Sequence, residues 1–414
     1  MNLWKIINPK RLRDYPRLIL FASWGVIIVN ILLHQGWIGG LTGILIGGDF
    51  ISNYSGGILY HNDIENLYNP AVQQESQSTL ISPSQTTGYA PFISPPYVAL
   101  AMSWIRSIPL AYAFIGWEIL NLVCVVVSVY LLTEFIIPRW LLKSGLSPVQ
   151  MSIIIFSTFA FIDGFISGQS HGITLLLCTG IILAMMRQQW ILAGILGSLL
   201  IYKPQFVIGF LICWLVWKSV RAILSFGIFT LMWQIPVVLA YGISPYLEYL
   251  KLSNSLLYLP YAKESFPISV MATPYALMAT LFPAGFAKVI QILFLLVGIA
   301  MVIFLSFVAY QSQTIPIYQR YFSISLALLF PLIIAPHTLI YDLLILVPAI
   351  ILLTNYSEIR PAIFKLTLIY YISLLFLPLI GYAVKLALPA LIPLSLLILL
   401  IIVYFRTNTI FERS

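Results

Sequence analysis

Residues 285–310 read GFAKVIQILFLLVGIAMVIFLSFVAY, and Lys288 is the one charged side chain in this run. An α-helix of about 20 apolar residues crosses the hydrocarbon core of a bilayer. A helix that is apolar on every side belongs in the core of a large protein or in a membrane. The run is therefore long enough, and apolar enough, to predict a membrane-spanning helix.

The remainder of the chain has the same character. Of its 414 residues, 61% are hydrophobic and 8% are charged, whereas about a quarter of the residues of a soluble domain are charged. The net charge of +8 arises from 21 Lys and Arg against 13 Asp and Glu. This composition excludes a soluble enzyme, a disordered chain and a nucleic-acid-binding protein, and it predicts an all-α polytopic membrane protein.

Apolar windows of membrane-spanning length predict about 12 spans in the sequence. They cover residues 18–46, 92–107, 111–137, 149–166, 170–187, 190–217, 222–241, 285–310, 322–335, 338–354, 363–383 and 387–405. The span 190–217 is long and is interrupted by Pro204, an irregularity that is tolerated where a helix lines a cavity. Two long polar segments divide the chain into a module 1–241 that includes loop 47–91, a loop 242–284, and C-terminal helices 285–414.

The distribution of Lys and Arg predicts the orientation, because these residues accumulate on the cytoplasmic side. Residues 18–105 contain no Lys or Arg, which places loop 47–91 outside. We therefore expect a multi-pass protein of the plasma membrane with both termini in the cytoplasm and both long loops outside. The same alternation of spans places the turn 163–171 on the cytoplasmic side, opposite Asp49, unless its two flanking helices are too short to reach the interface and leave the turn at cavity depth.

Asp49 is the first candidate for chemistry, in the sequence Gly47-Gly48-Asp49-Phe50 at the end of the first predicted span. Two glycines permit a tight turn. A carboxylate held partly desolvated at the membrane boundary suits a general base. The alternative interpretation is an Asp that caps a short helix, and spacing alone favours the cap.

Lys203 is energetically the most demanding residue, since an unpaired cation at the centre of a span costs about 3 kcal/mol. It either faces a cavity, where it would contact phosphate or a carboxylate such as Asp163, or it forms a buried ion pair or extends to the interface. Both interpretations stay open. His337 is predicted in an outer turn on the same side as Asp49, and Asp342, near the top of a span, also requires a partner.

A set of short motifs runs through most of the chain in a fixed order. These motifs are Asp49-Phe50-x3-Tyr54, Leu67-Tyr68-Asn69-Pro70, Tyr89-Ala90-Pro91-Phe92, Gly168-Gln169-Ser170-His171, Lys203-Pro204-Gln205 and Pro336-His337-x3-Tyr341-Asp342. In order and spacing they resemble the GT-C superfamily of membrane glycosyltransferases. The resemblance is closest to glycosyltransferase family 87, whose best-known members are mannosyltransferases. His171 departs from the pattern, in which Asn is expected.

The resemblance implies a GT-C-type fold with a helical outer loop after the first span, and it implies Asp49 as the catalytic base. A hexose, with mannose favoured, would pass with inversion from a polyprenyl-phosphate donor to a lipid-linked or glycan acceptor on the outer face. The expected partners are these substrates and membrane lipids, with no nucleic acid, metal or cofactor. The candidates for binding the donor phosphate or the acceptor are Lys203, His337, Lys263, Gln169, His171, Tyr341 and Asp342.

Two other functions remain as alternatives. A polysaccharide polymerase or ligase also joins polyprenyl-linked sugars, but such proteins rely on arginines in outer loops, where this chain is predicted to have Arg139 and Arg187. A transporter or lipid flippase requires ionisable residues within several spans, and the predicted spans contain chiefly Lys203 and Glu118.

Overall fold

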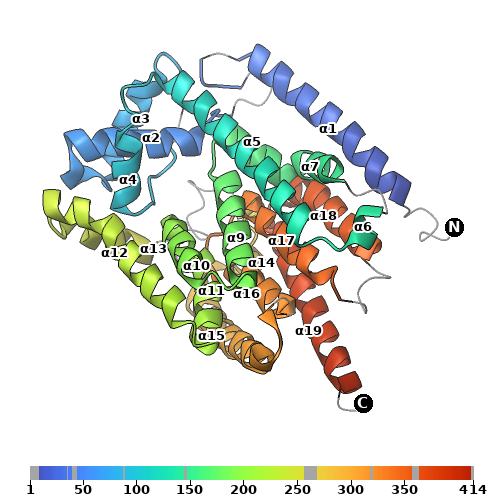
Figure 1. Ribbon diagram of the computed structural model, residues 1–414. Coiled ribbons are helices and arrows are strands. Elements are labelled where there is room, and N and C mark those ends of the chain that lie inside the picture. Colours follow the sequence, from blue (N-terminus) through green and yellow to red (C-terminus); the bar gives the residue numbers. More distant parts are fainter. Residues whose placement is uncertain are drawn as a thin grey trace.

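The computed structural model describes residues 9–34, 36–39, 44–86, 89–143, 147–255, 268–317, 320–356 and 363–411. Within these residues the chain is helical, and β-pairing is limited to two isolated bridges, Ile38 with Leu45 and Met271 with Leu339. Figure 1 shows α2, α3 and α4 gathered on one side, away from the ends of the chain. The prediction of an all-α fold is confirmed for the described residues.

Six helices among the described residues are long and apolar enough to cross a membrane. They are α1 (Pro9–Leu32), α5 (Leu110–Phe135), α12 (Val220–Tyr241), α15 (Ala287–Gln311), α18 (Ile363–Val384) and α19 (Leu391–Phe411). The pair α7 (Pro148–Phe156) and α8 (Phe159–Ser167), bent by 65°, is a seventh candidate. The chain is therefore a polytopic membrane protein, and the full set of 12 spans remains a prediction.

A group of shorter apolar helices forms the centre of the molecule. These are α9 (His171–Met186), α10 (Trp190–Leu199), η3 (Leu200–Tyr202), α11 (Gln205–Val216), α16 (Tyr321–Ile334), η9 (Ile340–Ile345) and α17 (Leu346–Leu353). Nearly every side chain of α16 is buried, and all these helices contribute to one large hydrophobic core. Helices α9, α16 and α17 are apolar on nearly every side because protein surrounds them, whereas α10 and α11 also expose apolar side chains such as Ile191 and Leu215.

The segment between α1 and α5 forms a separate helical layer. It contains α2 (Gly48–Asn62), η2 (Ile64–Asn66), α3 (Pro70–Ile81) and α4 (Pro96–Ser103). The backbone of α4 closely approaches α2, since a Cβ added at Gly57 would lie 2.6 Å from the Met102 carbonyl carbon. The remaining helices are α6 (Arg139–Lys143), α13 (Ser244–Ser255), α14 (Pro274–Leu281), η5 (Ile268–Val270), η6 (Ala284–Phe286), η7 (Ser312–Thr314) and η10 (Leu388–Ala390).

The prediction that residues 92–107 form a span is wrong. An eight-residue helix such as α4 is about 12 Å long, far too short to cross a bilayer. The Tyr54 hydroxyl of α2 also donates to the carbonyl oxygens of Arg106 at 2.9 Å and Ile108 at 2.7 Å. The chain is therefore still beside α2 when α5 begins. Residues 92–107 are apolar because α4 is buried against α2.

The prediction of one span over residues 190–217 is also wrong. Gln188, just before α10, and Trp190, the first residue of α10, line the same surface pocket as Trp217 and Lys218, which follow α11. Both ends of the segment therefore lie at one end of the molecule, and the segment is a helical hairpin. Its tip lies at Pro204, which has no N–H to continue a helical hydrogen-bond ladder.

This hairpin changes the position of several cations. Arg187 was predicted on the side opposite to Lys218 and Arg221, but the chain at 187–190 lies beside both of them. The end of α5 belongs to the same side, since the Arg187 guanidinium lies 4.2 Å from the centre of the Phe135 ring. The predicted alternation between residues 107 and 190 is therefore inverted, and cations gather at the end that holds the hairpin's two termini.

Candidate active site

A cavity of about 560 Å³ lies between the α2–α4 layer and the central helices. Five tracts that are distant in sequence meet there: α2, α4, the α8–α9 turn, the tip of the α10–α11 hairpin, and the segment from α16 into η9. The polar side chains that line the cavity include Asp49, Ser52, Asn53, Ser94, Gln169, Ser170, Lys203, Gln205, His337 and Asp342.

The turn that carries Asp49 is locked against the turn between α8 and α9. The Gly47 amide donates to the Ile166 carbonyl at 2.7 Å, and the Trp117 indole donates to the Gly168 carbonyl at 2.9 Å. Both Gly47 (φ +71°) and Gly168 (φ +76°) have left-handed backbones, which glycine adopts without steric cost. The prediction that turn 163–171 lies on the side opposite Asp49 is therefore wrong, and the alternative that it lies at cavity depth is correct, because the two turns are in direct contact and Gln169 lines the cavity.

The Asp49 carboxyl occupies the first turn of α2, where Gly47 is the N-cap. The alternative interpretation of Asp49 as the cap is thus not correct. Burial raises the pKa of Asp49 above its ordinary value of 3.8, while hydrogen bonds from Gln169 and Ser167 and the charge of Lys203 act in the opposite direction. A carboxylate with a raised pKa and hydrogen-bonded neighbours that fix its position has the properties of a general base.

Lys203 and Asp342 form an ion pair at the edge of the cavity. The Lys203 Nζ lies 2.7 Å from the Asp342 Oδ1, and the two side chains are 15% and 5% exposed. The other carboxylate oxygen of Asp342 accepts from the Leu339 amide at 3.2 Å, and the Lys203 Nζ lies 4.9 Å from the centre of the Tyr341 ring. Lys203 is thus both ion-paired and cavity-lining, which combines the two interpretations that the sequence left open.

His337 lies in the connection between α16 and η9 and faces the same cavity. Its Nδ1 is buried and has no hydrogen-bond partner among the described residues. Burial lowers the pKa of His337, the positive charge of Lys203 acts in the same direction, and Asp342 opposes both. The imidazole is therefore neutral at neutral pH, with a ring nitrogen available to a ligand.

Two of the sequence candidates are not among the cavity-lining side chains. His171 is 1% exposed and packs edge-on against Phe161, with 5.1 Å between ring centres, so its position is that of a packing residue. Lys263 lies outside the described residues. Gln169, Lys203, His337, Tyr341 and Asp342 all line the cavity together with Asp49.

Several cavity residues were not singled out from the sequence. The aromatic side chains Trp117, Tyr97, Tyr202 and Tyr249 line the cavity, and the buried Tyr97 hydroxyl has no hydrogen-bond partner among the described residues. Asn53 Nδ2 donates to the Asp49 carbonyl at 2.8 Å. The spacing of four residues between Asp49 and Asn53 was the available signal, because it places both on one face of a helix.

An apolar groove of about 890 Å³ adjoins the cavity. It is lined mainly by α15, including Ile292, Leu295 and Ile299, together with parts of α14 and α16. Ile208 and Pro336 line both the groove and the cavity. The polar cavity therefore continues into a groove with the apolar lining that a lipid chain requires.

Comparison with known proteins gives one match. The family described as glycosyltransferase family 87 matches residues 92–355, well over half of the chain. The matched region contains Gln169, Lys203, His337 and Asp342, whereas Asp49 precedes it. No curated protein and no solved structure matches the chain. Among the described residues, no group of three or more His, Cys, Asp or Glu side chains could hold a metal ion.

Proposed function

This chain belongs to glycosyltransferase family 87 and is a membrane glycosyltransferase, and we propose that it transfers a hexose, with mannose favoured, from a polyprenyl-phosphate donor. The acceptor is a lipid-linked sugar or a glycan. One observation carries the proposal: Asp49, the Lys203–Asp342 pair and His337 line one cavity that continues into an apolar groove. This arrangement combines a base, a phosphate-binding cation and space for a lipid.

Asp49 is the general base in this mechanism. Its carboxylate accepts the proton of an acceptor hydroxyl while the hydroxyl oxygen forms a bond to the anomeric carbon of the donor. The bond from that carbon to the phosphate oxygen breaks, and polyprenyl phosphate leaves with the electron pair, so the configuration inverts. The burial that raises the pKa of Asp49 also makes it a stronger base toward a hydroxyl.

Lys203 and His337 stabilise the leaving phosphate, on which negative charge grows as the glycosidic bond breaks. Asp342 is a positioning residue, since it holds the Lys203 ammonium at 2.7 Å. The neutral His337 ring donates or accepts a hydrogen bond without adding charge. Tyr341, which lies beside Lys203, completes this side of the cavity.

The adjoining groove accommodates the polyprenyl chain. Its lining is almost wholly apolar, with Lys288 and Gln291 as its charged and amide side chains. Packing of the lipid against this lining contributes van der Waals contacts of about 0.1–0.2 kcal/mol per atom pair. The groove thus holds the donor lipid at a distance from the reacting atoms.

The aromatic residues of the cavity suit an acceptor sugar. Tyr97, Tyr249 and Trp117 line it, and aromatic faces pack against the apolar faces of sugar rings. The Tyr97 hydroxyl, which has no hydrogen-bond partner among the described residues, is available to a sugar hydroxyl.

The positions of the cations support a cavity on the outer face of the plasma membrane. Arg187, Lys218, Arg221 and Arg320 belong to the end of the molecule away from the cavity, where Lys218, Arg221 and Arg320 line one pocket. Since Lys and Arg accumulate on the cytoplasmic side, this end faces the cytoplasm. Both chain termini are proposed to lie there as well.

The function is tested with the variant Asp49→Asn in purified protein that is given polyprenyl-phosphate mannose and analogous donors. We expect sugar transfer to fall by at least about 100-fold, with an unchanged unfolding temperature. Asp63→Asn is the matched control, because Asp63 follows the same helix but hydrogen-bonds Asn66 and does not line the cavity. Near-normal transfer by Asp49→Asn would sink the assignment of the base.

A further inference from the structure

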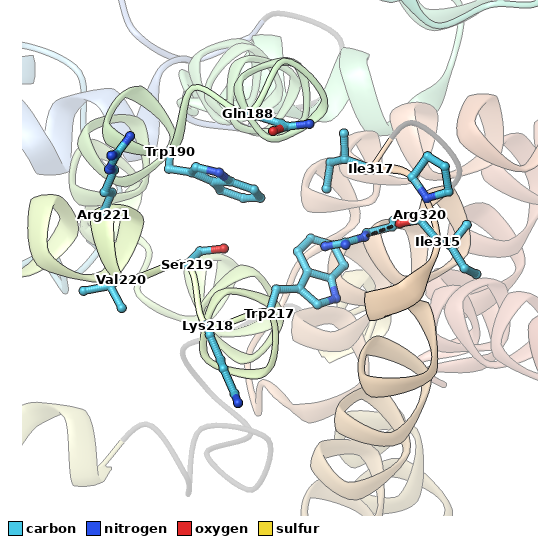
Figure 2. A pocket seen from close by; sticks show the side chains of 11 residues that line it. Gln188, Trp190, Trp217, Lys218, Ser219, Val220, Arg221, Ile315, Ile317 and Arg320 are labelled. Carbon is cyan, nitrogen blue, oxygen red and sulfur yellow. Dashed lines mark hydrogen bonds between the residues drawn. The ribbon is translucent and has the colours of Figure 1, made fainter.

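A second pocket, of about 570 Å³, lies at the end of the molecule away from Asp49. Three parts of the chain form it: the α9–α10 turn, the α11–α12 turn, and residues 315–317 with Arg320. Figure 2 shows the Trp190 ring extending into the pocket from one side and the Arg320 guanidinium lying over the Trp217 ring on the other. The catalytic proposal assigns no role to this pocket.

The pocket is strongly cationic. Lys218, Arg221 and Arg320 line it, and no acidic side chain is among the described residues that do so. Arg320 is held in place, since its Nη2 donates to the Gln313 carbonyl at 2.8 Å and its guanidinium lies 4.6 Å from the centre of the Trp217 ring. Lys218 and Arg221 are exposed at the rim (Figure 2). The charge is therefore available to a ligand of opposite sign.

The backbone adds to this positive potential. Helices α10, α12 and α16 all begin at the pocket, with N-caps Gln189, Ser219 and Arg320, and none of these N-caps makes a side-chain capping hydrogen bond. Helix starts carry a partial positive charge and amide groups that accept anions as partners. Three helix starts and three cationic residues therefore surround one cavity, with the Arg320 guanidinium inside it and the Lys218 and Arg221 side chains extending outward from its rim (Figure 2).

We propose that this pocket binds the phosphate group of an anionic ligand, the chemistry shared by an anionic phospholipid headgroup and free phosphate. Trp190 and Trp217 flank the pocket, and Trp is typical of the membrane–water interface, where headgroups lie. The site is separate from the Asp49 cavity, so it does not depend on the catalytic mechanism.

Lys218 offers a sharp test because its backbone is left-handed, with φ +53°. Glycine adopts this conformation without steric cost, so Lys218→Gly removes the charge and maintains or raises the unfolding temperature. Lys385→Gly is the matched control, since Lys385 also has a left-handed backbone (φ +58°) but does not line the pocket.

The experiment measures phosphatidylglycerol and phosphatidylcholine binding to the purified full chain by native mass spectrometry. We expect Lys218→Gly to weaken phosphatidylglycerol binding about fivefold and Lys218→Gly with Arg221→Gln about 25-fold, while Lys385→Gly binds as the unmodified chain does. Displacement by millimolar inorganic phosphate supports the site and identifies free phosphate as its ligand. If inorganic phosphate does not displace the lipid, the result supports a phospholipid headgroup as the ligand of the pocket. Equal binding of both lipids, or undiminished binding by the folded double variant, overturns the proposal.

Discussion

The Lys203 Nζ lies 2.7 Å from the Asp342 Oδ1, and this contact joins two turns that are 139 residues apart in the chain. Lys203 follows the first half of the α10–α11 hairpin, and Asp342 lies in η9. Each turn alone would expose a charge to an apolar interior, which costs several kcal/mol. The pair fixes both turns at the cavity beside Asp49.

Breaking this pair separates its structural role from its catalytic one. Lys203→Met leaves Asp342 charged and buried, so we expect a loss of about 3–5 kcal/mol in the free energy of unfolding. The double variant Lys203→Met with Asp342→Leu removes both charges and should regain most of that stability. Sugar transfer should stay low in both, because neither has a cation for the phosphate. Thermal unfolding and a transfer assay on the same samples check this, and restored transfer in the double variant would contradict a phosphate-binding role for Lys203.

The rate of transfer should depend on the protonation of Asp49. The base acts as a carboxylate, and its pKa is raised by burial, so the rate should fall as the pH is lowered through that raised pKa. Gln169→Ala removes a hydrogen bond that lowers this pKa, and the acidic limb of the pH–rate profile should therefore move to higher pH. If the pH–rate profiles of the unmodified chain and of Gln169→Ala coincided, Asp49 would not be the titrating base.

The same pKa shift makes a prediction about stability. Because the folded protein raises the pKa of Asp49, it favours the protonated carboxyl. The stability from this preference is fully present below the unfolded-state pKa and is lost as the pH rises through the folded-state pKa. Asp49→Asn should therefore unfold at the same or a higher temperature at neutral pH, as measured by thermal denaturation. If Asp49→Asn unfolded at a lower temperature than the unmodified chain, the Asp49 carboxylate would stabilise the fold, contrary to this prediction.

The contact between the turn at Gly47 and the turn at Gly168 should be sensitive to the addition of a single methyl group. Gly168 has φ +76°, and an added Cβ would lie 2.6 Å from the Phe50 Cβ, so Gly168→Ala should cost about 1–2 kcal/mol of unfolding free energy. It should also lower transfer, since Phe50 follows Asp49 directly. Gly116→Ala is the control, because a Cβ there has no neighbour within 4 Å and alanine favours a helix. If Gly168→Ala and Gly116→Ala had equal unfolding free energies, the close contact between the α8–α9 turn and the start of α2 would be refuted.

The sequence predicted the polar residues of the site better than the path of the chain. Asp49, Lys203, His337 and Asp342 stood out because ionisable groups near apolar segments need partners, and Gln169 was named from the motif Gly168-Gln169-Ser170-His171. Hydropathy could not separate the α10–α11 hairpin from one long span, since residues packed against protein are as apolar as residues packed against lipid. The α4 segment was misassigned for the same reason.

The two histidines show the limit of local sequence. His171 and His337 each belong to a short motif beside an apolar span, yet one packs against Phe161 and the other faces the cavity. The difference depends on the bend between α7 and α8 and on the end of α16, which are set by tertiary packing. Asn53 was missed although its spacing from Asp49 predicted a shared helix face.

The hairpin predicts a specific pattern of chemical labelling. Cysteines that replace the exposed Gln188 and Lys218 should react with a membrane-impermeant maleimide from the same side of sealed vesicles. A cysteine that replaces the exposed Glu65, beside α2, should react from the other side. The native Cys124, Cys178 and Cys213 are buried and give little background. Labelling of positions 188 and 218 from opposite sides would instead support the prediction that residues 190–217 form one membrane span.

Filling the apolar groove should affect donors according to the length of their lipid. Gly298 lines the groove, and a Cβ there has no neighbour within 4 Å, so Gly298→Trp can occupy the groove without disturbing the helix. The Trp side chain excludes part of a long polyprenyl chain from the groove, and the loss of about ten van der Waals contacts at about 0.1–0.2 kcal/mol each should raise its KM about tenfold.

A donor with a short prenyl chain, which does not reach Gly298, should keep its KM, and kcat should be unchanged for both donors because the reacting atoms lie in the other cavity. Gly227→Trp is the matched control, since a Cβ at Gly227 also has no neighbour within 4 Å but the residue does not line the groove. If Gly298→Trp changed the KM of long and short donors alike, the groove would not be the binding site of the polyprenyl chain, and the lipid would have to leave the Asp49 cavity by another path.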